Sequence, residues 1–169
     1  MGWDRHLEHW VVGHRVGFLN RVFEGLTYAG SYGGLWLALA AVLALAWRRP
    51  QLFLTALVAD ALAELSTDVL KAAIPRTRPH VHPLVAVPHS HSFPSGHAAT
   101  SFACATVLGL AAPRARIPLY VLAAAVAFSR VYVGVHYPTD ALAGAALGVG
   151  LGYLAVYVVD RFPRARSAS

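Results

Sequence analysis

The sequence is poor in charged residues. Of its 169 residues, 13% are Asp, Glu, Lys or Arg, whereas 57% are hydrophobic. Soluble domains carry roughly a quarter charged residues, so this composition argues against an ordinary soluble domain and favours a membrane protein.

The single cysteine, Cys104, lies in an apolar run, which excludes an intramolecular disulfide and predicts a small core residue. The opening MGWDRHLEHW lacks the apolar core of a signal peptide, so no cleavage is expected.

The chain also lacks a basic face. Its formal net charge is +6, but the basic residues stand in short clusters between apolar segments, without interleaved aromatic residues. We therefore expect no nucleic-acid partner. The clusters are better explained as membrane topology signals and as ligands for an anion.

Five apolar segments are long enough to cross a bilayer, which takes roughly 20 residues. They cover about 28–47, 51–74, 94–112, 117–135 and 138–160. Prolines agree with these limits, because Pro50 and Pro75 delimit the second segment and Pro138 opens the fifth. No linker or repeat divides residues 1–169. The expected fold is one all-α domain, a polytopic membrane bundle of about five transmembrane helices.

Residues 1–25 have a different pattern. Hydrophobic residues recur at helical spacing with charged residues between them: Trp3, Leu7, Trp10, Val11, Phe18 and Val22. This pattern predicts an amphipathic N-terminal helix that lies in the membrane interface, with its tryptophans at headgroup depth. A soluble helix packed on loops is the alternative.

Arginine clusters predict the orientation. They are Arg48 and Arg49, Arg114 and Arg116, and Arg161, Arg164 and Arg166. With five spans, all three clusters lie on one side of the membrane, which the positive-inside rule assigns to the cytoplasm. The C-terminus is then cytoplasmic, and residues 75–93 and the junction around His136 lie outside.

Under this topology three polar segments meet at the outer edge. They are KAAIPRTRP (71–79), FPSGH (93–97) and SRVYVGVHYPTD (129–140). They supply three cations: Lys71, Arg78 and Arg130. A helix N-terminus at Ser95–Gly96 adds unpaired N–H groups, with Ser95 to cap or donate a hydroxyl and Gly96 to permit close approach. Because arginine recognises phosphate oxygens in a planar, often bidentate way, we predict a phosphate pocket.

Two histidines predict a reaction in this pocket. Pro138 can occupy a first helical turn, which places Asp140 where its carboxylate reaches a ring nitrogen of His136. The carboxylate would fix the tautomer, as in a catalytic triad, and make His136 an activated nucleophile. His97, in the first turn of another helix, is placed to protonate a leaving oxygen. The three cations would neutralise charge on the transferring phosphoryl group.

The three segments resemble the signature of the type 2 phosphatidic acid phosphatase family, K-x6-R-P, P-S-G-H and S-R-x5-H-x3-D. Every defining position matches, and the resemblance covers roughly residues 51–160. It implies a phosphohistidine on His136, general-acid catalysis by His97, no metal or other cofactor, and an all-α membrane bundle, commonly with six spanning helices. This chain departs from that pattern, because an amphipathic segment stands where another span would be.

The leading hypothesis is an integral membrane lipid phosphatase on the outer face of a bacterial inner membrane. An isoprenyl diphosphate such as undecaprenyl diphosphate is the preferred substrate, with phosphatidic acid or phosphatidylglycerophosphate as alternatives. A non-enzymatic protein that binds or transports lipid phosphates would share the three cations, but binding alone would not need the two histidines and Asp140. Soluble relatives hold vanadate as a haloperoxidase cofactor, and five apolar spans argue against that role.

Acidic residues recur on one face of the second span: Asp60, Glu64 and Asp68. Charges in a span are costly, so these side chains should face the bundle interior or water. Pairing of Asp68 with Lys71 is the favoured explanation, and a proton pathway is the alternative.

The outer loop is rich in histidines, namely His80, His82, His89 and His91. We expect a solvated loop that contacts anionic headgroups rather than a metal site, since no cysteine or carboxylate accompanies the histidines.

Close helix packing, within the protomer or across a homodimer, is predicted by three glycines of the fifth span: Gly144, Gly148 and Gly152. Tyr132 and Tyr137 are expected to be interfacial anchors.

Overall fold

The computed structural model describes residues 2–79 and 81–161, and this part of the chain is helical with no strand. The order of elements is α1 (Gly2–Gly13), α2 (Gly17–Ala29), the short 3-10 helix η1 (Ser31–Gly33), α3 (Gly34–Ala46), α4 (Pro50–Ala73), α5 (Gly96–Ala111), η2 (Pro113–Ala115), α6 (Arg116–Tyr132) and α7 (Pro138–Arg161). The predicted all-α class is therefore confirmed for the described residues.

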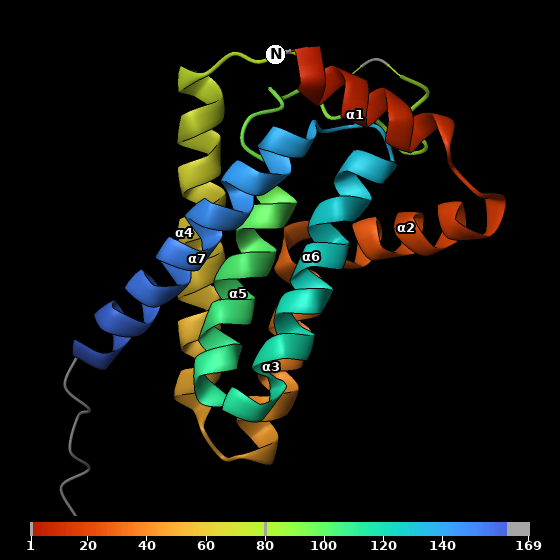
Figure 1. The fold of residues 1–169 in the computed structure, drawn as a ribbon. Helices are drawn as coiled ribbons and strands as arrows, with labels where there is room; N and C mark the ends of the chain where they lie inside the picture. Colours follow the sequence, from red (N-terminus) through yellow and green to blue (C-terminus); the bar gives the residue numbers. More distant parts are fainter. Residues whose placement is uncertain (1, 80, 162–169) are drawn as a thin grey trace, which may run out of the picture.

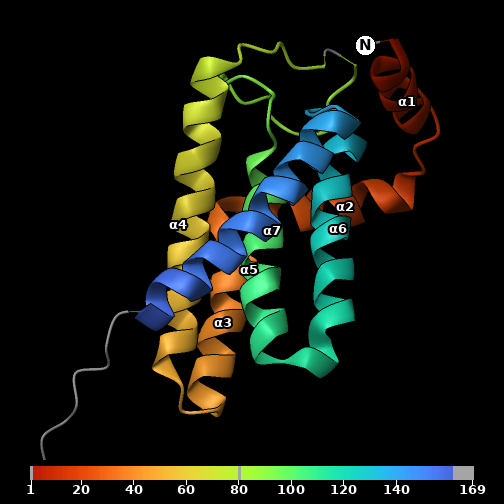
Figure 2. The ribbon, with the colours of Figure 1, turned by 60° about the vertical axis from the view of Figure 1, so that its left-hand side comes forward.

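Helix α5 lies at the centre of the bundle, with α4, α6 and α7 packed around it and α3 beside α4 (Figure 1). Two N-terminal helices lie outside this arrangement. Helix α1 lies over the end of the bundle where α7 begins (Figure 1), whereas α2 runs across the bundle beside α6 (Figure 2). The N-terminal segment thus contacts the end of the bundle at which the three predicted motif segments meet.

Length and apolarity identify two membrane spans among the described residues, Pro113–Tyr132 and Pro138–Arg161. A third span is formed if α2 is counted together with the segment Ser31–Ala46, which contains η1 and α3. The two parts are bent by 65° relative to each other. Helix α4 does not qualify because it carries three acids and a lysine, and α5 has 16 residues, fewer than the roughly 20 that a span needs. Helices lie at the predicted positions, but these criteria give two or three spans rather than five.

The N-terminal prediction is wrong in two details. The helix expected over 28–47 is broken at η1, where Tyr32 and Gly33 have positive φ angles of 51° and 63°. Asp60 packs against this corner so closely that a Cβ on Gly33 would lie 2.2 Å from its Oδ1. The amphipathic segment forms two helices, α1 and α2, instead of one. A helix cannot continue through left-handed residues, so the chain turns at η1.

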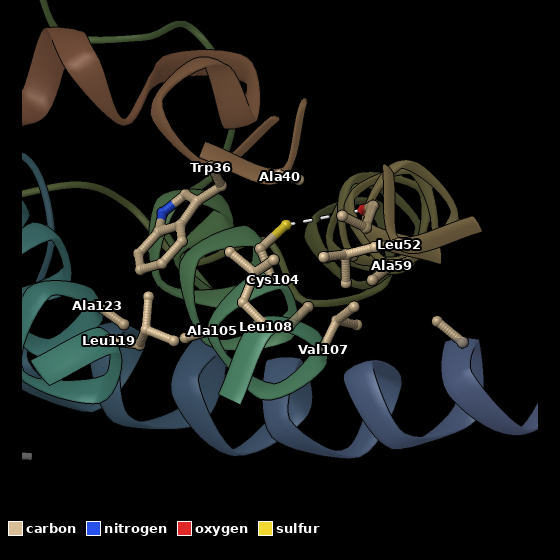
Figure 3. Close-up of a cluster of buried hydrophobic side chains, with 14 of the residues drawn as sticks. Trp36, Ala40, Leu52, Ala59, Cys104, Ala105, Val107, Leu108, Leu119 and Ala123 are labelled. Carbon is tan, nitrogen blue, oxygen red and sulfur yellow. Dashed lines mark hydrogen bonds between the residues drawn. The ribbon is translucent and has the colours of Figure 1, made fainter. Parts of the chain in front are cut away.

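The apolar core is built largely from small side chains. Figure 3 shows Trp36 of α3, Leu52 of α4 and Leu108 of α5 converging on one cluster. Cys104 is fully buried there, and its thiol points to the carbonyl oxygen of Ala56 at 3.7 Å. The predicted role of this cysteine as a core residue is confirmed.

The glycine ridge of α7 packs within the protomer. A Cβ added at any of the three glycines would lie 2.2 to 2.6 Å from a backbone carbonyl oxygen of α5 or of Ser95, which precedes α5. The glycines are Gly144, Gly148 and Gly152. Such a contact is too close for any side chain, so the two helices can meet only at glycine. Of the two alternatives left open by the sequence, contact inside the protomer explains the ridge.

We expect Gly148→Ala to destabilise the protein by about 1–3 kcal/mol, because the added Cβ would overlap the carbonyl of Ala99 and push α7 from α5. Thermal unfolding in detergent measures the effect. Gly150→Ala is the matched control, since no atom of the described residues lies within 4 Å of a Cβ there and alanine favours a helix. Equal effects of the two substitutions would contradict the packing role.

Candidate active site

A tight turn between α6 and α7 places Arg130 and His136 together. The backbone N–H groups of Val135 and His136 both donate to the carbonyl of Arg130, at 3.2 Å each. Gly134 has a φ of 80°, a conformation that glycine adopts without steric cost. Helix α7 then begins at Pro138, as predicted. Both functional side chains are buried, with 4% and 3% exposure.

Asp140 lies behind His136 and is fully buried. Its Oδ2 accepts a hydrogen bond from the backbone N–H of Tyr137 at 2.9 Å, an arrangement similar to a capping box. The same oxygen lies 3.4 Å from Nδ1 of His136, which is long for a formed hydrogen bond. The carboxylate nevertheless faces Nδ1, as predicted from the spacing, and leaves Nε2 directed elsewhere.

The other ring nitrogen of His136 faces a cation. Nη1 of Arg78 lies 3.0 Å from Nε2, and the same guanidinium nitrogen donates to the carbonyl of Val135 at 2.9 Å. Since a guanidinium can only donate, Nε2 accepts and carries a lone pair. Burial, with Arg78 and Arg130 nearby, lowers the pKa of His136 to about 4. The imidazole is therefore neutral at pH 7, as a nucleophile must be.

Arg78 is held in place by the loop that follows α4. Its Nε donates to the carbonyl of Ser90 at 2.8 Å, and Nη2 donates to the Ser90 hydroxyl and the His91 carbonyl at 3.2 Å each. These partners are neutral oxygens, and within residues 2–79 and 81–161 no carboxylate in direct contact cancels the positive charge. A fixed, uncancelled guanidinium is suited to binding phosphate.

His97 forms the opposite wall, in the first turn of α5. Its Nε2 lies 3.2 Å from the carbonyl oxygen of Thr27 and 3.3 Å from the hydroxyl of Ser31. Because a carbonyl can only accept, the first contact assigns the proton to Nε2. The corner between α2 and α3 thus supports His97, a contact that the sequence did not predict.

Lys71 and the start of α5 complete the group. Nζ of Lys71 lies 3.2 Å from Oδ1 of Asp68, which confirms the predicted pair. A Cβ on Gly96 would lie 3.6 Å from the same Nζ, so Lys71 reaches the N-terminus of α5. Ser95 is buried, but its hydroxyl has no partner in the described part of the chain and does not cap α5. Its backbone N–H instead donates to the Asp140 carbonyl at 3.0 Å.

A cavity of about 450 Å³ joins these side chains. Six of the eight predicted site residues line it: Lys71, Arg78, Gly96, His97, Arg130 and His136. The other two, Ser95 and Asp140, do not line it and lie next to those that do. Among the described residues, Nε of buried Arg130 makes no hydrogen bond. The cavity wall also contains two acids, Glu64 and Asp68, and two exposed tyrosines, Tyr28 and Tyr32.

Several secondary predictions have different outcomes. Tyr132 is not an interfacial anchor, because it is buried and its hydroxyl donates to Oδ1 of Asn20 at 2.9 Å. His91 contacts the carbonyl of Lys71 at 2.8 Å, and residues 2–79 and 81–161 contain no cluster of potential metal ligands. His80 and two arginines used for orientation, Arg164 and Arg166, lie outside the described residues.

One contact of a predicted site residue was missed from the sequence. Nη1 of Arg76 donates to Oδ1 of Asp140 at 2.6 Å and to Oγ1 of Thr139 at 2.7 Å. Nη2 of the same side chain donates to Asp4 of α1. Tyr137, predicted to be an anchor, lies under this guanidinium, 4.2 Å from ring centroid to Cζ. Arg76 stands two residues before Arg78, but no local pattern connects it to residues 4 and 140.

Neutral His136 backed by a carboxylate, with cations around a cavity, has the groups that phosphoryl transfer needs, and comparison with known families agrees. The model of the PAP2 superfamily matches residues 52–164. The chain belongs to the PAP2 superfamily. A similar curated protein is the decaprenylphosphoryl-5-phosphoribose phosphatase of Mycobacterium tuberculosis, 39% identical over 153 residues, 85% of this chain and 82% of the relative. An undecaprenyl-diphosphatase of Sulfolobus acidocaldarius is 32% identical, over 82% of this chain and 71% of the relative.

Solved PAP2 structures have the same fold. The transmembrane PAP2-type phosphatidylglycerolphosphate phosphatase of Bacillus subtilis has a TM-score of 0.77 and 32% identity, covering 98% of this chain and 88% of the relative. Aquifex aeolicus LpxE has a TM-score of 0.78 and 27% identity, covering 90% and 93%. The chain is accordingly a PAP2-type phosphatase, an enzyme that hydrolyses phosphate esters, and a membrane protein.

Proposed function

We propose that this PAP2 protein removes the terminal phosphate of a membrane lipid through a phosphohistidine on His136, without a metal ion. The observation that carries the proposal is the environment of the His136 ring. Asp140 faces Nδ1 at 3.4 Å, whereas Nε2 faces Arg78 and the cavity. A binding or transport protein would need the cations but not a buried, neutral histidine backed by a carboxylate.

In the first step the Nε2 lone pair attacks phosphorus. The P–N bond forms while the bond from phosphorus to the lipid oxygen breaks. For this step His97 is the imidazolium, which binds its second proton together with the anionic substrate and donates one proton to the lipid oxygen. Asp140 stabilises the positive charge that develops on the His136 ring. Lys71, Arg78 and Arg130 stabilise the equatorial phosphoryl oxygens.

In the second step water hydrolyses the phosphohistidine. His97 has lost its proton and acts as the base, so it accepts a proton from the attacking water. The P–O bond forms as the P–N bond breaks, which returns the electron pair to Nε2 of His136. Inorganic phosphate leaves, and both histidines regain their starting protonation states.

We place the site on the extracytoplasmic side of the plasma membrane, with the C-terminus in the cytoplasm. The α3–α4 and α5–α6 connections lie at the opposite end of the bundle from the start of α7 (Figure 1). These connections contain exposed arginines, Arg48, Arg49, Arg114 and Arg116. The positive-inside rule assigns them to the cytoplasm, which leaves the cavity on the outer side.

The acids of the cavity wall favour one class of lipid headgroup. Glu64 and Asp68 repel the extra negative charge of a diphosphate, and Asp68 is partly neutralised by Lys71. Carboxylates accept hydrogen bonds from hydroxyl groups. We therefore propose a phosphomonoester carried by a sugar or polyol on a lipid, in agreement with the phosphoribose in the name of the mycobacterial relative. An isoprenyl diphosphate is the second candidate, supported by the named activity of the Sulfolobus relative.

The proposed function is tested by phosphate release from four lipids by purified protein in detergent. The panel contains decaprenylphosphoryl-5-phosphoribose, undecaprenyl diphosphate, phosphatidylglycerophosphate and phosphatidic acid, each with and without EDTA. We expect release that survives EDTA and is fastest for a hydroxyl-bearing monoester. Binding without release from any lipid would contradict the enzymatic proposal, and a strict need for a divalent ion would contradict the metal-free mechanism.

We expect Glu64→Gln to raise kcat/KM for undecaprenyl diphosphate relative to decaprenylphosphoryl-5-phosphoribose about tenfold, or ~1.4 kcal/mol. The substitution removes a negative charge from the cavity wall and keeps the size of the side chain. Asp160→Asn is the control, because Asp160 lies at the C-terminal end of α7, whereas the cavity lies at its start. This substitution should leave the ratio unchanged. An unchanged ratio in Glu64→Gln would show that this carboxylate does not select the headgroup.

A further inference from the structure

Arg76 connects the N-terminal helix to the catalytic carboxylate. Its guanidinium donates to Oδ1 of Asp140 at 2.6 Å, the oxygen that does not face His136. On its other side it donates to Oδ2 of Asp4 in α1. The cation is therefore shared between Asp140, the carboxylate that faces His136, and a carboxylate that lies more than 130 residues away in the sequence.

Asp4 also holds the first turn of α7. Its Oδ1 accepts from the backbone N–H of Thr139 at 3.1 Å, and Oδ2 accepts from the Thr139 hydroxyl at 2.6 Å. Free N–H groups at a helix N-terminus are normally capped by a residue of the same helix. Here the cap comes from another helix, and Asp140 belongs to the turn that it caps.

The buried and exposed faces of α1 fit this arrangement. Asp4 and Glu8 are buried against the bundle, with 1% and 0% exposure, whereas Trp3 and Trp10 are 59% and 56% exposed. Exposed tryptophans next to an apolar bundle are typical of a membrane interface. The polar face of α1 therefore contacts the active-site end of the bundle, and its aromatic face is left for the lipid headgroups.

We propose that Arg76 is a positioning residue for the proposed reaction, held by Asp4 of the membrane-seated helix α1, and that it fixes Asp140 against His136. The inference rests on the proposed function. Arg76 acts on the reaction through Asp140, since it does not line the cavity. Helix α1 is then a part of the active site rather than a peripheral anchor.

The proposal predicts opposite electrostatic effects for two substitutions. His136 binds a proton as pH falls, and the nearby Arg76 cation opposes this binding. Arg76→Gln should therefore make His136 hold its proton more tightly and move the acid limb of kcat/KM to higher pH by about one to three units. Asp4→Asn removes an anion that shares Arg76, so its acid limb should move to lower pH.

Other charged groups lie at this end of the bundle on each neighbouring element. Arg78 of the loop after α4 and Arg130 of α6 act on His136, Lys71 of α4 acts on His97 of α5, and Arg5 and Glu8 of α1 act on Tyr137. All of these groups are unchanged in Arg76→Gln and in Asp4→Asn. Arg76→Lys retains the charge but cannot donate to both carboxylates in a fixed geometry. We expect its acid limb near the wild-type position, with kcat about 10²-fold lower, because small misplacements of reacting groups have effects of that size.

The experiment measures pH profiles of p-nitrophenyl phosphate hydrolysis for wild type, Arg76→Gln, Arg76→Lys and Asp4→Asn. Arg114→Gln, an exposed arginine between α5 and α6, is the control and should match wild type. Opposite shifts in Arg76→Gln and Asp4→Asn support the proposal. Acid limbs that stay in place in both variants, with only stability lowered, would overturn it and leave Arg76 with a purely structural role.

A second measurement does not depend on turnover. NMR of protein labelled with ¹⁵N-histidine in detergent follows the protonation of His136 directly. We expect its titration at higher pH in Arg76→Gln than in wild type, and at lower pH in Asp4→Asn. A wild type that releases no phosphate from any substrate would contradict the proposed function, whereas unchanged titrations in both variants would overturn the role of Arg76. Failure of one variant to fold leaves the other as the test.

Discussion

His136→Ala is expected to abolish phosphatase activity, with a loss of about 10⁶ in kcat. Removing the nucleophile of a covalent mechanism has an effect of this order in a serine protease, where binding and oxyanion stabilisation remain. Here the cations proposed to bind phosphate are retained, since Arg78 is also held by Ser90 and His91. The variant should therefore still bind vanadate or phosphate. Turnover of p-nitrophenyl phosphate and anion binding are measured on the same preparation.

The control for this prediction is His89→Ala. His89 is exposed in the outer loop and does not line the cavity, so its replacement should leave kcat unchanged. Substantial activity in His136→Ala, with binding intact, would show that the nucleophile is another group. Loss of both activity and anion binding would indicate instead that the turn between α6 and α7 has collapsed.

Asp140→Asn is expected to lower kcat by about 10⁴, the effect of the corresponding change in a serine protease triad. An asparagine keeps the shape of the side chain but has no charge to stabilise the imidazolium that develops on His136. Its amide can also donate to Nδ1 and favour the wrong tautomer. The KM for p-nitrophenyl phosphate should change little, because Asp140 does not line the cavity. An effect confined to KM would contradict its proposed role.

The grouping of the candidate site residues could be predicted from the sequence because they stand at fixed spacings on continuous elements. His136 and Asp140 are four residues apart across the start of a helix, and the proline between them marks that start. One turn therefore determines their relative position. The three motif segments could be assigned to the same end of the bundle from the order of apolar segments alone.

The N-terminal part could not be predicted because its structure depends on contacts between distant residues. A run of apolar residues over 28–47 favours one continuous helix, but Asp60 packs at Gly33 and the chain turns there. Asp4 lies in a helix whose periodicity predicts only an amphipathic face. Its partners, Arg76 and Thr139, become neighbours only in the folded protein. The spacing of charged residues along the chain contains no signal for such a contact.

The most direct test of the central claim is to trap the covalent intermediate. His97→Ala removes the base for the second step, whereas p-nitrophenyl phosphate, with its good leaving group, needs little protonation in the first. After a short incubation, mass spectrometry should locate an acid-labile, base-stable phosphoryl group on His136 in His97→Ala. The phosphoryl group should be absent from the double variant His97→Ala, His136→Ala. A phosphoryl group on any other residue, or none in a variant that still releases p-nitrophenol, would contradict a phosphohistidine at His136.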